Sequence, residues 1–269
     1  MKLLDGAELA GFVKERQAKQ VRNLRQAHQI QPKLAIVQTK DDPVINTYVR
    51  LKKRYGEDIL IDVDIHVIDQ AETLEVIQTL NDDDSVHGII VQLPLSDPSQ
   101  TETIVNAIAA SKDVDALGAQ AAFDPATPTA ISWLLAGYNV GLEHKKIVVV
   151  GHGRLVGAPL VKMWRNSGLD VTVADKSTEN IEGVIKSADV VVTAVGVPGL
   201  IKSSMLQPDA VVVDAAVASE DGKLVGDLED SVRERDDLTI TPTKGGVGPL
   251  TVAALFDNVI RAARVRAES

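Results

Sequence analysis

The chain contains no cysteine. This absence excludes disulfides, thiolate metal sites, iron–sulfur clusters and a cysteine nucleophile. Aromatic residues make up only 3% of the sequence, and no apolar run reaches the roughly 18 residues of a membrane-spanning helix. Residues 1–20 alternate apolar and charged side chains and lack the continuous apolar core of a signal peptide. We therefore expect a cytoplasmic protein with no membrane partner.

Acidic residues outnumber basic ones, with 38 Asp and Glu against 28 Lys and Arg. The net charge is −10 and the isoelectric point is near 5.0, which oppose a surface for duplex nucleic acid. The 269 residues are 45% hydrophobic and 25% charged, as is usual for an α/β globular protein. This length suffices for one large domain or two modest ones, and we expect two.

Two alternations of strand and helix patterns divide the sequence near a turn-rich stretch at residues 121–128. The first predicts strands at 34–38, 61–67 and 88–93 and helices at 43–56, 71–80 and 101–110. Its first helix is expected to begin at Asp42-Pro43 and to stop at Gly56. The second predicts strands at 147–150, 171–174, 190–195, 211–214 and 238–241, with helices after the first three. The last apolar helix, at 251–265, belongs to neither alternation and is free to pack back on the first domain.

Three glycines, Gly151, Gly153 and Gly157, lie directly between a predicted strand and a predicted helix. A tight turn with bare backbone amides lets a pyrophosphate approach the helix N-terminus. Asp175 ends the next strand, where an acid accepts hydrogen bonds from ribose hydroxyls. The spacing Gly-x-Gly-x-x-x-Gly differs from the usual fingerprint, and a structural turn is the alternative. His152 contacts a phosphate or simply covers the turn.

The expected fold class is therefore α/β with two domains. An N-terminal α/β catalytic domain, residues 1–125, is completed by a C-terminal helix at 249–269. A Rossmann-like doubly wound domain for a dinucleotide covers residues 126–248.

In the first domain, Tyr48 and Lys52 are four residues apart and share one helix face. A lysine in a partly dry pocket loses basicity and can carry a proton near neutral pH. Spacing alone favours an ordinary solvent-facing helix. Gln92 stands at the carboxyl end of a buried strand, where open parallel sheets place ligands. Asp115 follows a helix in a loop where aspartate is often only a turn former.

Five segments in order resemble motifs of the bifunctional methylenetetrahydrofolate dehydrogenase/methenyltetrahydrofolate cyclohydrolases. They are TYVRLKK, HGIIVQLPL, KDVDA, GHGRLVGAP and TPTKGGVGPLT, and they span nearly the whole chain. The resemblance implies oxidation of 5,10-methylenetetrahydrofolate with a nicotinamide dinucleotide, followed by hydrolysis to 10-formyltetrahydrofolate. It also implies a homodimer and requires no metal.

The resemblance implies a role for each matching residue. Lys52 would transfer the proton in the cyclohydrolase step, tuned by Gln92, while Tyr48 stacks on the folate and Asp115 hydrogen-bonds the pterin. The implied substrate site comprises Tyr48, Val91, Gln92, Leu93, Gly245, Gly246, Val247, Gly248 and Pro249. The implied cofactor site comprises Gly151, His152, Gly153, Asp175, Lys176 and Val217.

Several positions depart from the family pattern. Gly153 replaces a serine, Ala116 a glycine, Lys244 a proline and Ala216 a glycine. Asp175 and the missing serine favour NAD, whereas the family favours NADP, which Lys176 with Ser177 can hold; we expect NADP, with NAD the alternative. Two other functions stay open: an NAD(P)-dependent dehydrogenase of a small hydroxy or amino acid, and a non-enzymatic dinucleotide sensor.

Overall fold

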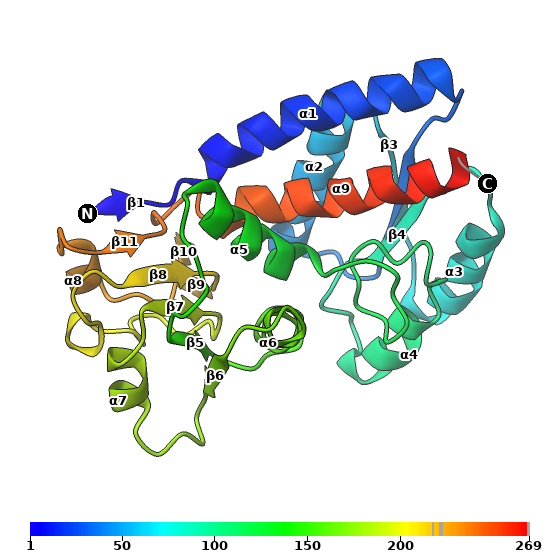
Figure 1. The fold of residues 1–269 in the computed structure, drawn as a ribbon. Coiled ribbons are helices and arrows are strands. Elements are labelled where there is room, and N and C mark those ends of the chain that lie inside the picture. The colour runs from blue at the N-terminus through cyan, green and yellow to red at the C-terminus, as the bar shows by residue number, and fades with distance from the viewer. Residues whose placement is uncertain (217, 221–222, 268–269) are drawn as a thin grey trace. The chain divides into compact units, whose positions relative to one another are not determined.

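The computed structural model describes residues 1–216, 218–220 and 223–267 (Figure 1). Its backbone forms two compact units, each made from separate stretches of chain. Unit 1 comprises Met1–Ala10 and Thr127–Thr251, and unit 2 comprises Gly11–Ala126 and Val252–Ser269. In the part of the chain that the structure describes, no helix is both long and apolar enough to cross a membrane.

Unit 1 contains a six-stranded parallel sheet. Its strand order is β1 (Lys2–Leu3), β11 (Thr239–Ile240), β8 (Val211–Asp214), β7 (Val190–Thr193), β5 (Ile147–Val150) and β6 (Val171–Ala174). Each of the five strands predicted in this part of the sequence is present. Two are shorter than predicted, because the ladder ends at Thr193 in β7 and at Ile240 in β11.

The edge strand β1 was not foreseen. Residues 1–10, which the sequence assigns to the first domain, belong to unit 1 because Lys2 and Leu3 pair in parallel with Thr239 and Ile240. The backbone N–H of Leu4 also donates to the carbonyl of Ile240 at 2.8 Å. The backbone groups on the outer side of β11, which would otherwise be unpaired at the edge of the sheet, therefore bond to residues 2–4.

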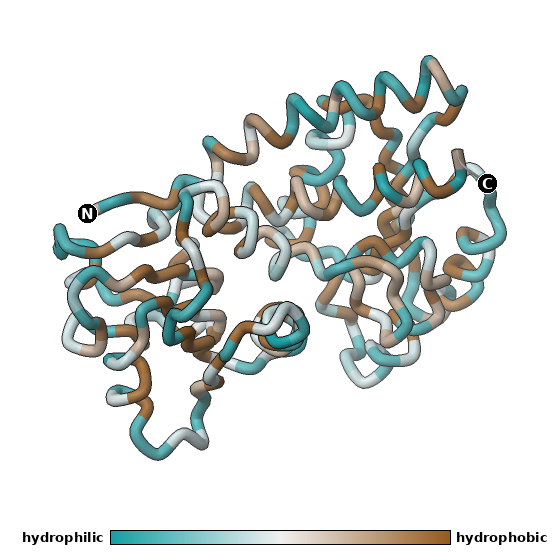
Figure 2. The backbone as a smooth tube through the Cα atoms, viewed as in Figure 1, coloured by the Kyte–Doolittle hydropathy of each residue, from teal (hydrophilic) through white to brown (hydrophobic). Residues whose placement is uncertain are grey.

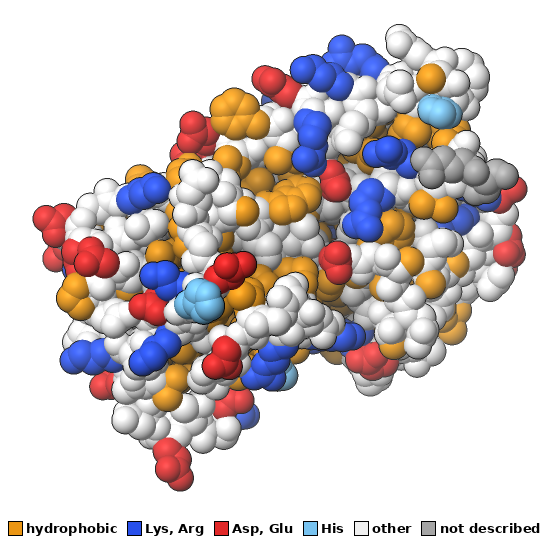
Figure 3. Space-filling model, viewed as in Figure 1, with side chains coloured by type: hydrophobic (Ala, Val, Ile, Leu, Met, Phe, Trp, Pro, Cys, Tyr) orange, Lys and Arg blue, Asp and Glu red, His pale blue; other side chains and the backbone are white. Residues whose placement is uncertain are grey.

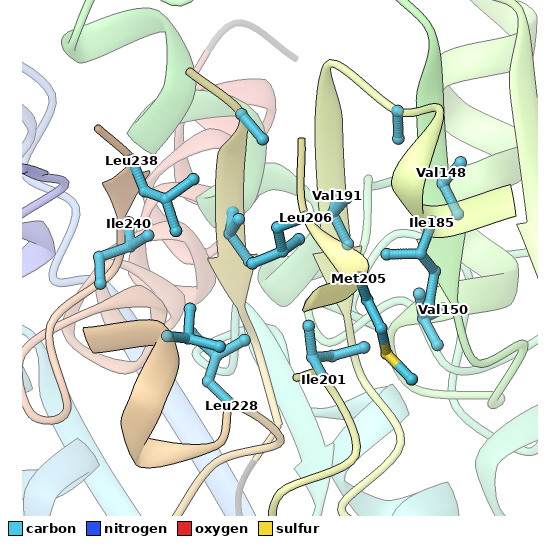
Figure 4. Packing of buried hydrophobic residues seen from close by; sticks show 14 of the residues in the cluster. Val148, Val150, Ile185, Val191, Ile201, Met205, Leu206, Leu228, Leu238 and Ile240 are labelled. Carbon is cyan, nitrogen blue, oxygen red and sulfur yellow. The ribbon is translucent and has the colours of Figure 1, made fainter. Parts of the chain in front are cut away.

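The remaining elements of unit 1 connect and cover the sheet. They are α5 (Ala126–Gly137), α6 (Gly157–Asn166), α7 (Ile181–Lys186), α8 (Asp230–Arg233) and the hairpin β9 (Ala218–Glu220) to β10 (Lys223–Val225). The third predicted helix is only a 3-10 turn at Ser203–Met205. In the core, Val148 and Val191 of the sheet face Ile185 and Met205 (Figure 4).

Unit 2 is built on a three-stranded parallel sheet. The order is β3 (Asp62–Val67), β2 (Lys33–Gln38) and β4 (Gly88–Val91). Its helices are α1 (Gly6–Ala27), α2 (Pro43–Asp58), α3 (Thr73–Asp82), α4 (Thr101–Asn106) and α9 (Val247–Ala267), of which α1 and α9 begin in unit 1. The strands β2 and β4 are largely buried and hydrophobic, whereas β3 alternates hydrophobic residues with Asp62, Asp64 and His66; the hydropathy along the backbone is coloured in Figure 2. Lys and Arg side chains follow α1 on the face that Figure 3 shows.

The helix α2 begins as predicted and ends later than predicted. The side chain of Asp42 accepts hydrogen bonds from the backbone N–H groups of Val44 and Ile45, and Pro43 occupies the first turn. Gly56 does not stop the helix. A Cβ at Gly56 would lie 2.4 Å from the side chain of Val63, so this glycine permits a close approach of helix and strand.

The last helix packs in unit 2 through an aromatic pair. The rings of Phe256 on α9 and Tyr55 on α2 stack with centroids 5.1 Å apart. The hydroxyl of Tyr55 donates to Gln17 Oε1 on α1 at 2.8 Å, and Gln17 Nε2 donates to the carbonyl of Ala253. These contacts join α1, α2 and α9 around the helix face that carries Lys52.

Candidate active site

Unit 2 brings Lys52 and Gln92 into direct contact, although 40 positions separate them in the sequence. Lys52 lies on α2, and Gln92 follows β4 at its carboxyl end. Lys52 Nζ donates to Gln92 Oε1 at 2.8 Å. Gln92 is itself held by its backbone N–H, which donates to the carbonyl of Val37 at 2.8 Å, and by its Nε2, which donates to the carbonyl of Leu93 at 2.9 Å.

Lys52 and Asp115 form an interacting pair of groups with displaced pKa values. Burial lowers the pKa of Lys52, and the nearby carboxylate of Asp115 opposes that shift. Burial also raises the pKa of Asp115, opposed by Lys52. Because desolvation disfavours both charges, Lys52 reaches its neutral form at a lower pH than a free lysine. A partly dry amine of this kind can accept and return a proton.

Two buried polar side chains hold the loop that carries Asp115. Asp113, only 1% exposed, accepts hydrogen bonds from the backbone N–H groups of Leu117 and Gly118, at 3.4 and 2.7 Å. Asn258 on α9 donates to the carbonyls of Val114 and Asp124, both at 2.9 Å. Asn258 was not among the residues predicted from the sequence. An amide in a mostly apolar helix was the available signal.

Ala116 adopts a left-handed backbone conformation with φ of 55°. The family pattern has glycine at this position, directly after the aspartate. A Cβ in this region costs about 1–2 kcal/mol, so the departure noted in the sequence places strain beside Asp115.

The other implied substrate residues of unit 2 differ in how far their side chains are exposed. Tyr48 is half-buried, one turn before Lys52 on the same face of α2. Leu93 is half-buried after β4. The side chain of Val91 packs in the hydrophobic core at 2% exposure, so only its backbone can face a ligand.

In unit 1 the glycine turn connects β5 to α6. Gly151 has φ of 92°, and its N–H donates to the carbonyl of Ala174 at 2.8 Å. A Cβ at Gly157 would lie 2.0 Å from the carbonyl oxygen of Gly151, so the helix start can touch the strand end only with glycine here. His152 and Gly153 are exposed, and a Cβ at Gly153 would meet nothing within 4 Å. The turn thus leaves open space at the N-terminus of α6, as a dinucleotide phosphate requires.

Asp175 follows β6 beside this turn. Its Oδ1 accepts from the N–H of Ser177 at 2.8 Å and from the hydroxyl of Ser177 at 2.6 Å. These bonds lower the pKa of Asp175, helped by the nearby His152 and Lys176. The group is therefore an anion at neutral pH. Lys176 and Ser177 are exposed.

The implied substrate residues Gly245 to Pro249 lie at the junction between the last strand and α9. Val247, Gly248 and Pro249 form the first turn of α9, where proline is tolerated. Gly245 has φ of 82°, and its carbonyl accepts from the N–H of Ala7 at 2.9 Å. Gly246 packs against Gly6, whose Cβ position lies 1.8 Å from the Gly246 oxygen. Lys244 is exposed in unit 1.

Val217, the last of the implied cofactor residues, lies outside the described residues. Ala216 precedes it, and its N–H donates to Asp214 Oδ1 at 3.2 Å. The assignment of Val217 to the cofactor stays a prediction, as do the roles of the other site residues.

The fold and the two sites define a class of α/β protein in which a Rossmann-type dinucleotide unit accompanies a second α/β unit bearing a lysine–glutamine pair. Two family models match the sequence. Residues 4–115 match the catalytic domain of tetrahydrofolate dehydrogenase/cyclohydrolase, and residues 125–267 match its NAD(P)-binding domain. The chain belongs to the tetrahydrofolate dehydrogenase/cyclohydrolase family.

Relatives of known sequence and structure agree with this assignment. The bifunctional protein FolD of Exiguobacterium sibiricum is 37% identical, over 97% of this chain and 99% of that protein. The crystal structure of the Campylobacter jejuni FolD methylenetetrahydrofolate dehydrogenase/cyclohydrolase has a TM-score of 0.94, 35% identity and 99% coverage of both chains. A Trypanosoma brucei FolD complexed with NADP and an inhibitor has a TM-score of 0.92 and 26% identity, covering 99% of this chain and 98% of that one.

Proposed function

We propose that this chain oxidises 5,10-methylenetetrahydrofolate to 5,10-methenyltetrahydrofolate with NADP and then hydrolyses the product to 10-formyltetrahydrofolate. The hydrogen bond between Lys52 Nζ and Gln92 Oε1 carries the proposal, because it joins two family motifs in one partly dry site. Full-length similarity to bifunctional FolD proteins supports both activities. The chain is thus an enzyme of one-carbon metabolism.

The residues of unit 1 fit the dinucleotide. Gly151 and Gly157 let the backbone pack closely within the turn, and Gly153 leaves the approach to the N-terminus of α6 open for a pyrophosphate. Bound NADP would accept a hydride from the methylene carbon of the folate. Asp175 would accept hydrogen bonds from the ribose, while Lys176 and Ser177 would meet the 2′-phosphate.

In the hydrolytic step, neutral Lys52 takes a proton from water as the water oxygen bonds to the methenyl carbon. The carbon–nitrogen bond to one ring nitrogen then breaks as the new hydroxyl becomes the formyl carbonyl and releases its proton to solvent, and Lys52 returns the first proton to that nitrogen. Gln92 holds the amine through its side-chain oxygen. Tyr48 stacks on the folate ring, and Asp115 hydrogen-bonds the pterin. The family motif also assigns Gly245, Gly246 and residues 247–249 to folate binding.

The family likeness also supports a cytoplasmic homodimer. Size-exclusion chromatography with light scattering tests the assembly. A mass of one chain at micromolar concentration would contradict it.

An absorbance assay tests the activity itself. Purified protein is given 5,10-methylenetetrahydrofolate with NADP or NAD, and the methenyl product is followed. A separate assay adds the methenyl compound without dinucleotide and follows its loss. We expect turnover in both and faster oxidation with NADP. No turnover with either dinucleotide and no folate binding would refute the proposal.

A further inference from the structure

The loop after β7 forms a wall of the proposed dinucleotide site. In the sheet, β5 lies between β6 and β7, so the chain reverses its direction of strand addition at β5 and β7. Ligands of doubly wound sheets bind at the carboxyl ends of strands at such a switch point. The glycine turn follows β5 there, and residues 194–197 follow β7. The two segments touch, because a Cβ at Gly151 would lie 2.9 Å from the side chain of Val195.

The same loop presents apolar side chains to the surface. Val195 is 42% exposed and Val197 is 48% exposed, and Gly196 between them has φ of 79° with open space around its Cβ position. Exposed valines at the ligand end of a sheet are suited to the flat apolar faces of a nucleotide ring.

One buried carboxylate determines the shape of this loop. Asp227 is completely buried. Its Oδ2 accepts from the hydroxyl of Thr193 at 2.5 Å and the N–H of Val195 at 2.9 Å. Its Oδ1 accepts from the N–H groups of Gly196 and Val197, both at 2.8 Å. Three consecutive amides therefore point inward to the carboxylate.

Asp227 is itself fixed by backbone contacts. Its carbonyl accepts from the N–H of Ile201 at 2.9 Å, and the N–H of Glu229 donates to the carbonyl of Ile201 at 2.9 Å. A buried carboxylate is tolerated only when hydrogen bonds replace its water, and here four donors do so. The carboxylate and the loop thus have little freedom to move relative to each other.

We propose that Asp227 is a positioning residue for the dinucleotide: its carboxylate turns the amides of residues 195–197 inward and so sets Val195 and Val197 as an apolar wall of the cofactor site. The inference rests on the proposed function, since it places the dinucleotide at the glycine turn. It adds a residue that itself does not touch the cofactor and that no sequence motif indicated.

The variant Asp227→Asn tests this role at constant side-chain volume. An amide has one acceptor in place of two, so at least one of the inward N–H groups loses its partner. We expect KM for NADP to rise about tenfold or more, because a small displacement of positioning groups has a large effect on binding geometry. Cyclohydrolase turnover without dinucleotide should stay within about twofold, since Lys52 and Gln92 belong to unit 2.

Asp189→Asn is the matched control. Asp189 precedes β7 at the opposite end of the strand and accepts from the N–H of Lys146 at 2.8 Å and from Gln207 Nε2 at 3.1 Å. We expect this variant to lower thermal stability without changing KM for NADP. If Asp227→Asn does not fold, Thr193→Val removes one of the four donors and should raise KM for NADP several-fold.

The outcomes separate this inference from the proposed function. An unaltered enzyme without NADP-dependent oxidation would refute the proposed function. An active unaltered enzyme whose KM for NADP is unchanged by Asp227→Asn or Thr193→Val would overturn only the role of Asp227.

Discussion

Replacing Lys52 with methionine should separate the two activities. Methionine approximates the length of the lysine but cannot carry a proton or donate to Gln92 Oε1, which Lys52 Nζ contacts at 2.8 Å. Proton transfer by a positioned side chain contributes about 10²- to 10⁴-fold, or about 3–5 kcal/mol of activation free energy. We expect cyclohydrolase turnover to fall by this factor. Oxidation of the methylene compound should fall much less, because hydride transfer requires no proton on Lys52.

The pH dependence of cyclohydrolase turnover is a second test of the role of Lys52. Burial lowers the pKa of Lys52 below the 10.5 of a free lysine. Since the neutral amine accepts the proton, cyclohydrolase turnover should rise with pH through this lowered pKa and level off before 10.5. The rise should vanish in Lys52→Met.

The neighbouring Lys53 provides a control on the same helix. It is exposed, and Lys53→Met should leave both turnover numbers and the pH profile within about twofold of the unaltered enzyme. Hydrolysis is followed by loss of the methenyl absorbance after correction for the uncatalysed reaction. A hydrolysis rate that Lys52→Met leaves unchanged would refute the proton-transfer role.

Three further predictions concern other features. Ala116→Gly should raise the free energy of unfolding by about 0.5–1 kcal/mol in urea titrations, because relief of left-handed strain exceeds the entropy that glycine adds to the unfolded chain; lower stability would contradict this. Asp175→Ser should raise the NADP-to-NAD ratio of kcat/KM about tenfold by removing an anion near the 2′-phosphate; an unchanged ratio would show that Asp175 does not read the ribose. Burial lowers the pKa of His87 from 6.5 to about 4, so the unfolded chain binds more protons in this interval and stability falls as pH drops from 6.5 to 4. His87→Gln should flatten this dependence in urea titrations, and an unchanged slope would assign it to other groups.

The strands were predictable because their signal is local. Residues 147–150 and 190–193 are continuous β-branched runs, which mark buried parallel strands without knowledge of their partners. The start of α2 was equally local, since Asp42 and Pro43 occupy adjacent positions of a standard helix start.

Two helices were not predicted: α5, which begins between two prolines, and α1, which is rich in charged residues. The stretch at 121–128 contains Pro125 and Pro128 and has the composition of turns, yet α5 begins at Ala126 and accepts Pro128 within its first turn. The helix α1 was not predicted because its many charged residues hide the helical spacing of its apolar residues. Two of these, Val21 and Leu24, are buried.

The site was only partly predictable for a different reason. The four-residue spacing of Tyr48 and Lys52 fits a solvated helix face as well as a site, and local pattern could not decide between them. The contact that distinguishes a site from a solvated face joins Lys52 to Gln92, which follows a different element. The catalytic roles of these two residues were inferred from family motifs. The partners of Asn258 and Asp227 depend on the tertiary fold, because they are far from these residues in the sequence.

The pairing of β1 with β11 bears on how the chain is made. The sheet of unit 1 receives its edge from Lys2 and Leu3, and unit 2 receives α9 from residue 252 onward. During translation, the first strand must therefore wait for a partner near Thr239, and unit 2 must wait for the last helix. Such long sequence separations slow folding. Nascent chains should thus emerge with both units incomplete and apolar surface exposed, and this interleaved topology lengthens the interval in which they are prone to aggregate.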